Sequence, residues 1–131
     1  MVNIVLACHG DLGDGLIQVA EMIAGPAEGL YSVPLLPGES PESYGEKLAR
    51  TLSELEGKQT LILVDLLGGT PCNVVAREVV KANVAGVTGV NLPMLLELLM
   101  ARAGSSLEEL AQMTAKAGQD SVVNLGLVLR R

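Results

Sequence analysis

The chain has 131 residues, of which 49% are hydrophobic and 18% charged, and its formal net charge is −6. This composition indicates a single folded domain over residues 1–131, and the core must be aliphatic because Phe and Trp are absent. The acidic balance, without any Lys/Arg cluster, argues against nucleic-acid binding and against attachment to an anionic membrane surface.

The first half of the chain has the pattern of two strand–helix pairs. An apolar run predicts a strand over Val2–Ala7, and the spacing of apolar residues predicts a helix over about Asp14–Ala24. A second strand is expected over Leu30–Leu35. Ser40-Pro41 then supplies an N-cap and a proline at the first helical position, for a helix that ends at Gly57.

The second half continues the alternation. Thr60–Val64 is apolar on both faces, as expected of a central parallel strand. Thr70-Pro71 repeats the cap-and-proline pattern and predicts a helix that runs to about Ala82. A fourth strand is expected over about Ala85–Val90, and a helix over Pro93–Ala103.

The last segment predicts one more helix and a surplus strand. Ser106 and Glu109 have the spacing of a capping box, for a helix that ends at Gly118. Leucine at every second position near the C-terminus predicts a strand over residues 121–129. Such a strand needs a sheet edge, either in its own sheet or in that of a partner.

These elements predict a doubly wound α/β fold, flavodoxin-like and mostly parallel, with strand order 2-1-3-4. Helices would cover both faces, and the C-terminal strand would be an extra antiparallel edge. In such sheets, binding sites form at the carboxyl ends of the strands where the strand order reverses. Because His9 follows the first strand and Asp65 the third, we expect these two side chains to meet.

The candidate catalytic residues are His9, which is the single histidine, and Asp65. A carboxylate beside an imidazole fixes its tautomer, leaves the other ring nitrogen free as a nucleophile, and stabilises positive charge on the ring. Gly68, Gly69 and Thr70 follow Asp65 at an expected helix start, where free backbone N–H groups suit a phosphate.

Several other chemistries lack their sequence patterns. The chain contains no P-loop and no dinucleotide-binding glycine motif, so we expect no nucleotide cofactor. Cys8 and Cys72 are too few for a disulfide framework or a zinc site, so we expect no metal. Neither a signal peptide nor an apolar run of about 18 residues is present, so we expect a cytoplasmic protein without membrane insertion. A nucleophilic histidine, an orienting carboxylate and a phosphate-binding helix start, without a nucleotide motif, indicate reversible phosphoryl transfer between protein side chains.

Three motifs at strand ends resemble the IIA component of the mannose/fructose/sorbose family of the bacterial phosphoenolpyruvate-dependent sugar phosphotransferase system (PTS). They are Val5–Gly10, Leu63–Asn73 and Gly89–Leu95. The resemblance implies a phosphotransferase that accepts a phosphoryl group from the carrier protein HPr. It would pass the group to a histidine of a IIB component, on a separate chain, for sugar uptake and phosphorylation.

The same resemblance assigns roles to residues. His9 would be phosphorylated on Nε2, Asp65 would hold Nδ1, and the Thr70 hydroxyl and amide would contact the phosphoryl group. The residues implied to face protein partners are Gly10, Leu67, Asn91 and Pro93. The family forms homodimers that exchange the C-terminal strand, and its members associate indirectly with the membrane components IIC and IID. The sequence of this chain does not identify the transported sugar, because a IIA component does not contact it.

Three alternatives stay open at this point. The phosphotransferase subunit of dihydroxyacetone kinase shares the fold and the histidine. A receiver-like signalling domain would be phosphorylated on Asp65 instead. A regulatory binding module would transfer no phosphate. The chemical stability of the phosphorylated residue, and its transfer between purified components, distinguish these readings.

Overall fold

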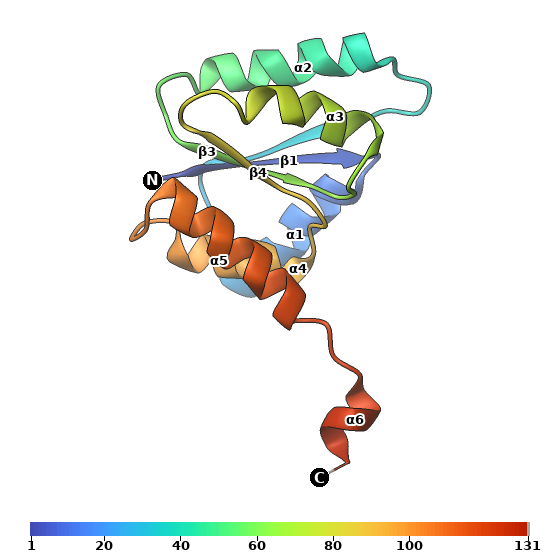
Figure 1. The fold of residues 1–131 in the computed structure, drawn as a ribbon, viewed down its shortest axis with the longest axis vertical. Helices are drawn as coiled ribbons and strands as arrows, with labels where there is room; N and C mark the ends of the chain where they lie inside the picture. Colours follow the sequence, from blue (N-terminus) through green and yellow to red (C-terminus); the bar gives the residue numbers. More distant parts are fainter. Residues whose placement is uncertain (131) are drawn as a thin grey trace.

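The computed structural model describes residues 1–130 and is built around a four-stranded sheet with helices on both sides (Figure 1). The strand–helix alternation predicted through the fifth helix is confirmed, with boundaries that shift by a few residues. In chain order the elements are β1 (Asn3–His9), α1 (Leu12–Ala24), β2 (Leu30–Leu35), α2 (Pro41–Glu54), β3 (Thr60–Val64), α3 (Gly69–Glu78), β4 (Val84–Val87), α4 (Leu92–Ala101), α5 (Leu107–Asp120) and α6 (Leu125–Leu129).

The sheet is parallel throughout, and its strand order is β2-β1-β3-β4, as predicted. β1 therefore lies between β2 and β3, and Ala7 stands opposite both Val33 and Val64. β2 is added on one side of β1, and β3 and β4 are added on the other, so the strand order reverses at β1. The carboxyl ends of β1 and β3 therefore lie side by side. This is the edge where the sequence predicts the site.

Each face of the sheet has its own core, and both are mainly aliphatic as predicted, except that the ring of Tyr44 is fully buried on the α2 side. Figure 1 shows α2 and α3 above the sheet and α1, α4 and α5 below it. Successive residues of β1 alternate between the two faces. Ile4 and Leu6 pack in the cluster that includes Leu98 and Leu110, whereas Val5 and Ala7 pack in the cluster that includes Tyr44 and Leu48.

Two predicted helix starts are confirmed, and another was wrong. Ser40 caps α2, and Ser106 forms the predicted capping box with Glu109. The structure adds a cap that was not predicted, Asn91 at the start of α4. Thr70 is not an N-cap, because α3 already begins at Gly69 and is capped by Gly68. Gly68 has a φ of +88°, which only glycine adopts readily, so the turn closes two residues earlier than predicted.

The predicted C-terminal strand is wrong for this chain: residues 125–129 form the short helix α6. A strand needs a neighbour for its backbone groups, and α6 projects away from both edges of the sheet (Figure 1). A helical turn satisfies those groups locally, and the Asn124 side chain accepts a hydrogen bond from the N–H of Leu127. The apolar alternation gives no means of distinguishing these two outcomes.

Candidate functional site

His9 and Asp65 meet at the carboxyl edge of the sheet. His9 is the last residue of β1, and Asp65 directly follows β3. Nδ1 of His9 lies 2.9 Å from Oδ2 of Asp65, and the backbone N–H of His9 donates to the same oxygen at 3.0 Å. The side chain of His9 is 47% exposed, whereas that of Asp65 is 11% exposed. A largely buried carboxylate thus holds an imidazole ring that solvent can reach.

This contact determines the tautomer of the ring. An ionised carboxylate only accepts hydrogen bonds, so Nδ1 of His9 carries the proton that it donates to Asp65. In the neutral ring, Nε2 then has a free lone pair. The arrangement matches that of a carboxylate that orients a catalytic imidazole.

The first turn of α3 lies beside the free nitrogen. A Cβ atom placed on Gly69 would lie 3.8 Å from Nε2 of His9 and 3.6 Å from Cε1. Gly69 has a φ of +81°, so a side chain at this position would be strained as well as close to the ring. Thr70, half-buried, is the second residue of α3. The positive end of the helix dipole therefore lies next to Nε2, where it favours a bound anion.

The other predicted residues divide into two groups. Gly10 and Leu67 lie in the loops that follow β1 and β3, and Leu67 is largely exposed. Asn91 and Pro93 lie at the start of α4, and the structure does not link them to His9 by a hydrogen bond. The Asn91 side chain is bound within the chain: it accepts from the N–H of Met94 at 3.1 Å and donates to Ser121 Oγ at 3.3 Å.

The two cysteines take no part in this arrangement. Cys8 packs in the core on the α1 and α4 side of the sheet, and Cys72 packs against the core on the α2 side, so they lie on opposite faces as free thiols. Burial and the nearby Asp65 carboxylate raise the pKa of the Cys8 thiol to about 12. Cys8 is therefore a neutral thiol near pH 7 and a poor nucleophile.

One pocket in the structure lies away from His9. A pocket of about 530 Å³ opens at the amino ends of β3 and β4, and its lining includes Leu52, Lys58, Thr60 and Glu78. Among residues 1–130, the structure brings no three His, Cys, Asp or Glu side chains into a cluster suited to a metal ion. Over the same residues, no helix is both long enough and apolar enough to cross a bilayer. His9 is an exposed ring on an open edge, an arrangement accessible to a protein-borne reactant.

Comparisons with known proteins indicate one family for this chain. Residues 3–115 match the family model of the PTS system fructose IIA component. The mannose-specific EIIAB component of Escherichia coli K12 is 38% identical over 124 residues, which cover 92% of this chain and 38% of that protein. The fructose-specific EIIA component of Bacillus subtilis is 33% identical over 123 residues, which cover 92% of this chain and 84% of that protein.

Solved structures give the same result. The mannose/sorbose-specific IIA subunit from Enterococcus faecalis superimposes with a TM-score of 0.87 at 30% identity, and the match covers 94% of this chain and 93% of that one. The EIIA component from Streptococcus agalactiae has a TM-score of 0.89 at 28% identity over 97% and 99% of the two chains. The chain spans about two fifths (38%) of the length of the first curated relatives, the EIIAB proteins.

Proposed function

The chain belongs to the mannose/fructose/sorbose family of PTS IIA components, and we propose that it is a phosphocarrier that works through His9. It accepts a phosphoryl group from phospho-HPr and passes it to a histidine of a IIB component. The observation that carries this proposal is the 2.9 Å contact between Nδ1 of His9 and Asp65, because it leaves Nε2 as the free nucleophilic nitrogen.

The proposed transfer needs only side chains that the two proteins bring together. The Nε2 lone pair attacks the phosphorus of the donor phosphohistidine, and a new N–P bond forms as the donor N–P bond breaks. The donor nitrogen keeps the electron pair of the broken bond. With a proton on Nδ1 and a phosphoryl group on Nε2, the His9 ring is positively charged, and the Asp65 carboxylate stabilises that charge. The second transfer repeats these steps with the IIB histidine as the acceptor.

We assign the binding of the phosphoryl oxygens to the first turn of α3. Gly68, Gly69 and Thr70 offer backbone N–H groups at the positive end of the helix, and Thr70 adds a hydroxyl donor. Phosphoryl transfer passes through a loose, in-line transition state, so donors fixed in advance supply much of the catalysis. The closeness of Gly69 to Nε2 supports this assignment.

The partners are inferred from family membership and from the exposure of the site. The Escherichia coli relative is named as a joined EIIAB component, which supports a IIB protein as the acceptor. Gly10, Leu67, Asn91 and Pro93 remain our candidates for contact with HPr or IIB. We place the protein in the cytoplasm, in indirect association with the membrane components IIC and IID.

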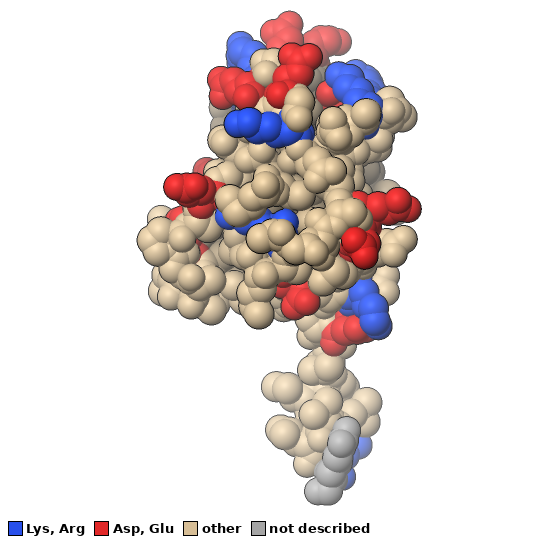
Figure 2. Space-filling view, turned by 90° about the vertical axis from the view of Figure 1, so that its left-hand side faces the viewer, with Lys and Arg blue, Asp and Glu red and all other residues tan. Residues whose placement is uncertain are grey.

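The tail supports a homodimer. Val122, Leu125, Leu127 and Leu129 are between 63% and 77% exposed, and Figure 2 shows the projecting tail mostly in tan, with blue at its tip. Exposed apolar side chains gathered on one segment are typical of a protein interface. We propose that the tail of each copy packs on the other copy and buries these apolar side chains there.

One reconstitution tests the proposal. The purified chain is incubated with phosphoenolpyruvate, enzyme I and HPr; the labelled residue is mapped by mass spectrometry, and a IIB protein is then added. We expect label on His9 that is stable in base, lost in acid and removed by IIB. Label on Asp65 that hydroxylamine cleaves would favour a receiver domain instead. Label that IIB leaves in place would contradict the carrier role, and its transfer to dihydroxyacetone kinase would identify that system.

A further inference from the structure

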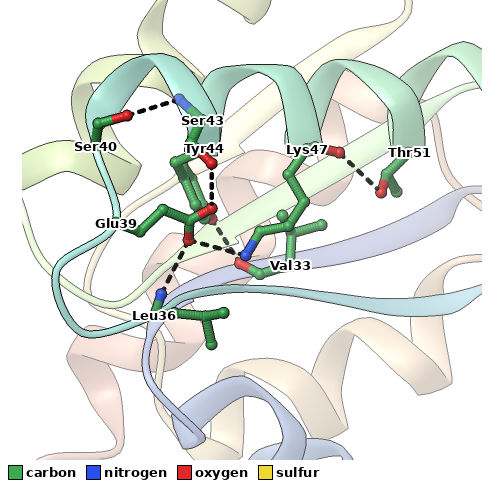
Figure 3. A network of polar contacts seen from close by, with 8 residues as sticks. All are labelled: Val33, Leu36, Glu39, Ser40, Ser43, Tyr44, Lys47 and Thr51. Carbon is green, nitrogen blue, oxygen red and sulfur yellow. Dashed lines mark hydrogen bonds and ion pairs between the residues drawn. The ribbon is translucent and has the colours of Figure 1, made fainter.

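A polar network holds the loop between β2 and α2 (Figure 3). His9 stands opposite Leu35, the last residue of β2, and the N–H of Gly10 donates to the carbonyl of Leu35 at 2.9 Å. Leu36 is the next residue, and its side chain is 52% exposed. A large apolar side chain is therefore held in solvent at the same edge of the sheet as the reactive ring.

The backbone of this loop is a closed turn. The N–H of Glu39 donates to the carbonyl of Leu36 at 3.0 Å, and Pro37 and Gly38 occupy the two central positions. The φ of +76° at Gly38 and the preceding proline match a type II turn. The Glu39 carboxylate closes the turn from the other side, because its Oε1 accepts from the N–H of Leu36 at 3.0 Å.

The same carboxylate fastens the turn to α2. Lys47 Nζ donates to Glu39 Oε1 at 2.9 Å, and Ser43 Oγ donates to Oε2 at 2.9 Å. Only 10% of the Glu39 side chain is exposed, so both donors act on a largely buried charge. α2 is itself tied to the sheet by Tyr44, whose hydroxyl donates to the carbonyl of Val33 at 2.6 Å.

We propose that Glu39 is a positioning residue that holds Leu36 as part of the contact surface for the phosphodonor protein. Leu36 gains little from its own burial, so its order comes from the backbone turn bond and from the Glu39 carboxylate, which holds the N–H of Leu36. The site offers further exposed leucines for the same contact, Leu66 and Leu67 after β3. Preorganised apolar side chains around a reactive group strengthen docking of a protein that carries a complementary apolar patch. This inference rests on the proposed phosphocarrier function.

The role predicts an effect on donor binding and no effect on the chemistry at His9. Initial rates of phosphoryl transfer are measured against phospho-HPr concentration for the whole chain and for Glu39→Ala. We expect KM for phospho-HPr to rise by roughly fivefold to tenfold, the effect of losing one anchored contact, with kcat unchanged. Glu42→Gln, an exposed carboxylate in the first turn of α2, is the matched control and should leave both constants unchanged.

A double-mutant cycle tests whether Glu39 acts through Leu36. Leu36→Ala should raise KM by a similar factor, and Glu39→Ala should add little to it, because the two changes remove one contact. Hydrogen exchange at the Leu36 amide should be faster in Glu39→Ala than in the wild type, and this readout is independent of activity. Lys47→Met should raise KM by a smaller factor, because two donors to Glu39 remain.

Two kinds of result overturn the inference, and they differ. If the wild type is phosphorylated on His9 but Glu39→Ala lowers kcat alone, or the two KM effects multiply, the positioning role is wrong and the carrier function stands. If phospho-HPr does not label the wild type at all, the carrier function fails and the inference fails with it.

Discussion

The carboxyl edge of the sheet and the C-terminal tail differ in whether their side chains find partners within the chain. At the edge, the buried Asp65 carboxylate has its partner within the chain, the ring and backbone of His9. In the tail, five exposed Val and Leu side chains from Val122 to Leu129 are more than half accessible, and burial within this chain gives them no stability. At the edge, the contact between His9 and Asp65 Oδ2 forms within one copy, whereas the tail leaves its apolar side chains in solvent.

Phosphoryl transfer and assembly therefore depend on separate regions of the chain. The reacting geometry at His9 is set by strand order and by the start of α3, so a monomer can hold it. The tail leaves its apolar surface exposed in this chain, and the proposed homodimer would bury that surface against another copy. Changes at the edge should therefore act on phosphoryl transfer, and changes in the tail should act on assembly.

The largest effect is expected at His9. His9→Ala removes the only histidine, and phosphorylation by HPr should fall to background. The side chain is about half exposed, so the thermal midpoint should stay close to that of the wild type. Labelling followed by mass spectrometry and a melting curve measure both. Normal labelling of this variant would remove His9 from the mechanism.

Asp65→Ala should slow transfer by roughly 100-fold or more, since the ring loses its orientation and its compensating charge. Asp65→Asn separates these contributions, because the amide oxygen can still accept a hydrogen bond but carries no charge. Rapid-quench measurement of a single transfer from phospho-HPr gives the rate. An unchanged rate in both variants would leave Asp65 with only a structural role.

Deleting residues 122–131 should convert a dimer into a monomer while His9 is still phosphorylated. The cut keeps Ser121, which accepts a hydrogen bond from Asn91 and donates to the carbonyl of Gly118 at 2.7 Å, so α5 stays anchored. Light scattering gives the mass, and the labelling assay gives the activity. A truncated chain that remains dimeric would show that the interface lies elsewhere.

The same substitution, leucine to alanine, compares the packing of the core with that of the tail. Leu110→Ala, at a fully buried position, should lower the free energy of unfolding by about 2–5 kcal/mol. Leu127→Ala, at an exposed one, should change it by less than about 0.5 kcal/mol at protein concentrations where the chain is monomeric. Urea unfolding measures both. A large loss for Leu127→Ala in the monomer would mean that the tail packs on its own core.

Sequence patterns predicted the sheet order and the meeting of His9 with Asp65, because parallel strands bring their carboxyl ends to one edge whatever the side-chain details. They missed the role of Glu39, which lies in a stretch predicted only as a loop. The available signal was the Pro37-Gly38 turn followed by a carboxylate and, eight positions on, Lys47. Whether Lys47 reaches Glu39 depends on how α2 packs on β2, and the periodicity of apolar residues does not predict that packing.

The tail was mispredicted for a different reason. Residues 121–129 alternate as a strand would, but alternation states only which side chains share a face, and it supplies no partner for backbone N–H and C=O groups. Without a neighbouring edge, a short helix capped by Asn124 satisfies part of that need within the chain. The truncation experiment above tests whether this segment joins two copies.

The smallest effect concerns the capping box that starts α5. Hydrogen bonds from the backbone and side chain of Ser106 hold the pKa of Glu109 below its ordinary value of 4.5. The ionised carboxylate therefore stabilises the fold above that ordinary value, and the contribution is lost as the pH falls through the lowered pKa. Glu109→Gln should melt slightly below the wild type near pH ~7, and the gap should close toward pH ~3. Glu108→Gln, which removes the same charge outside the capping box, is the control for simple charge effects. A gap that persists or widens in acid would mean that the ionised form of Glu109 does not stabilise this helix start.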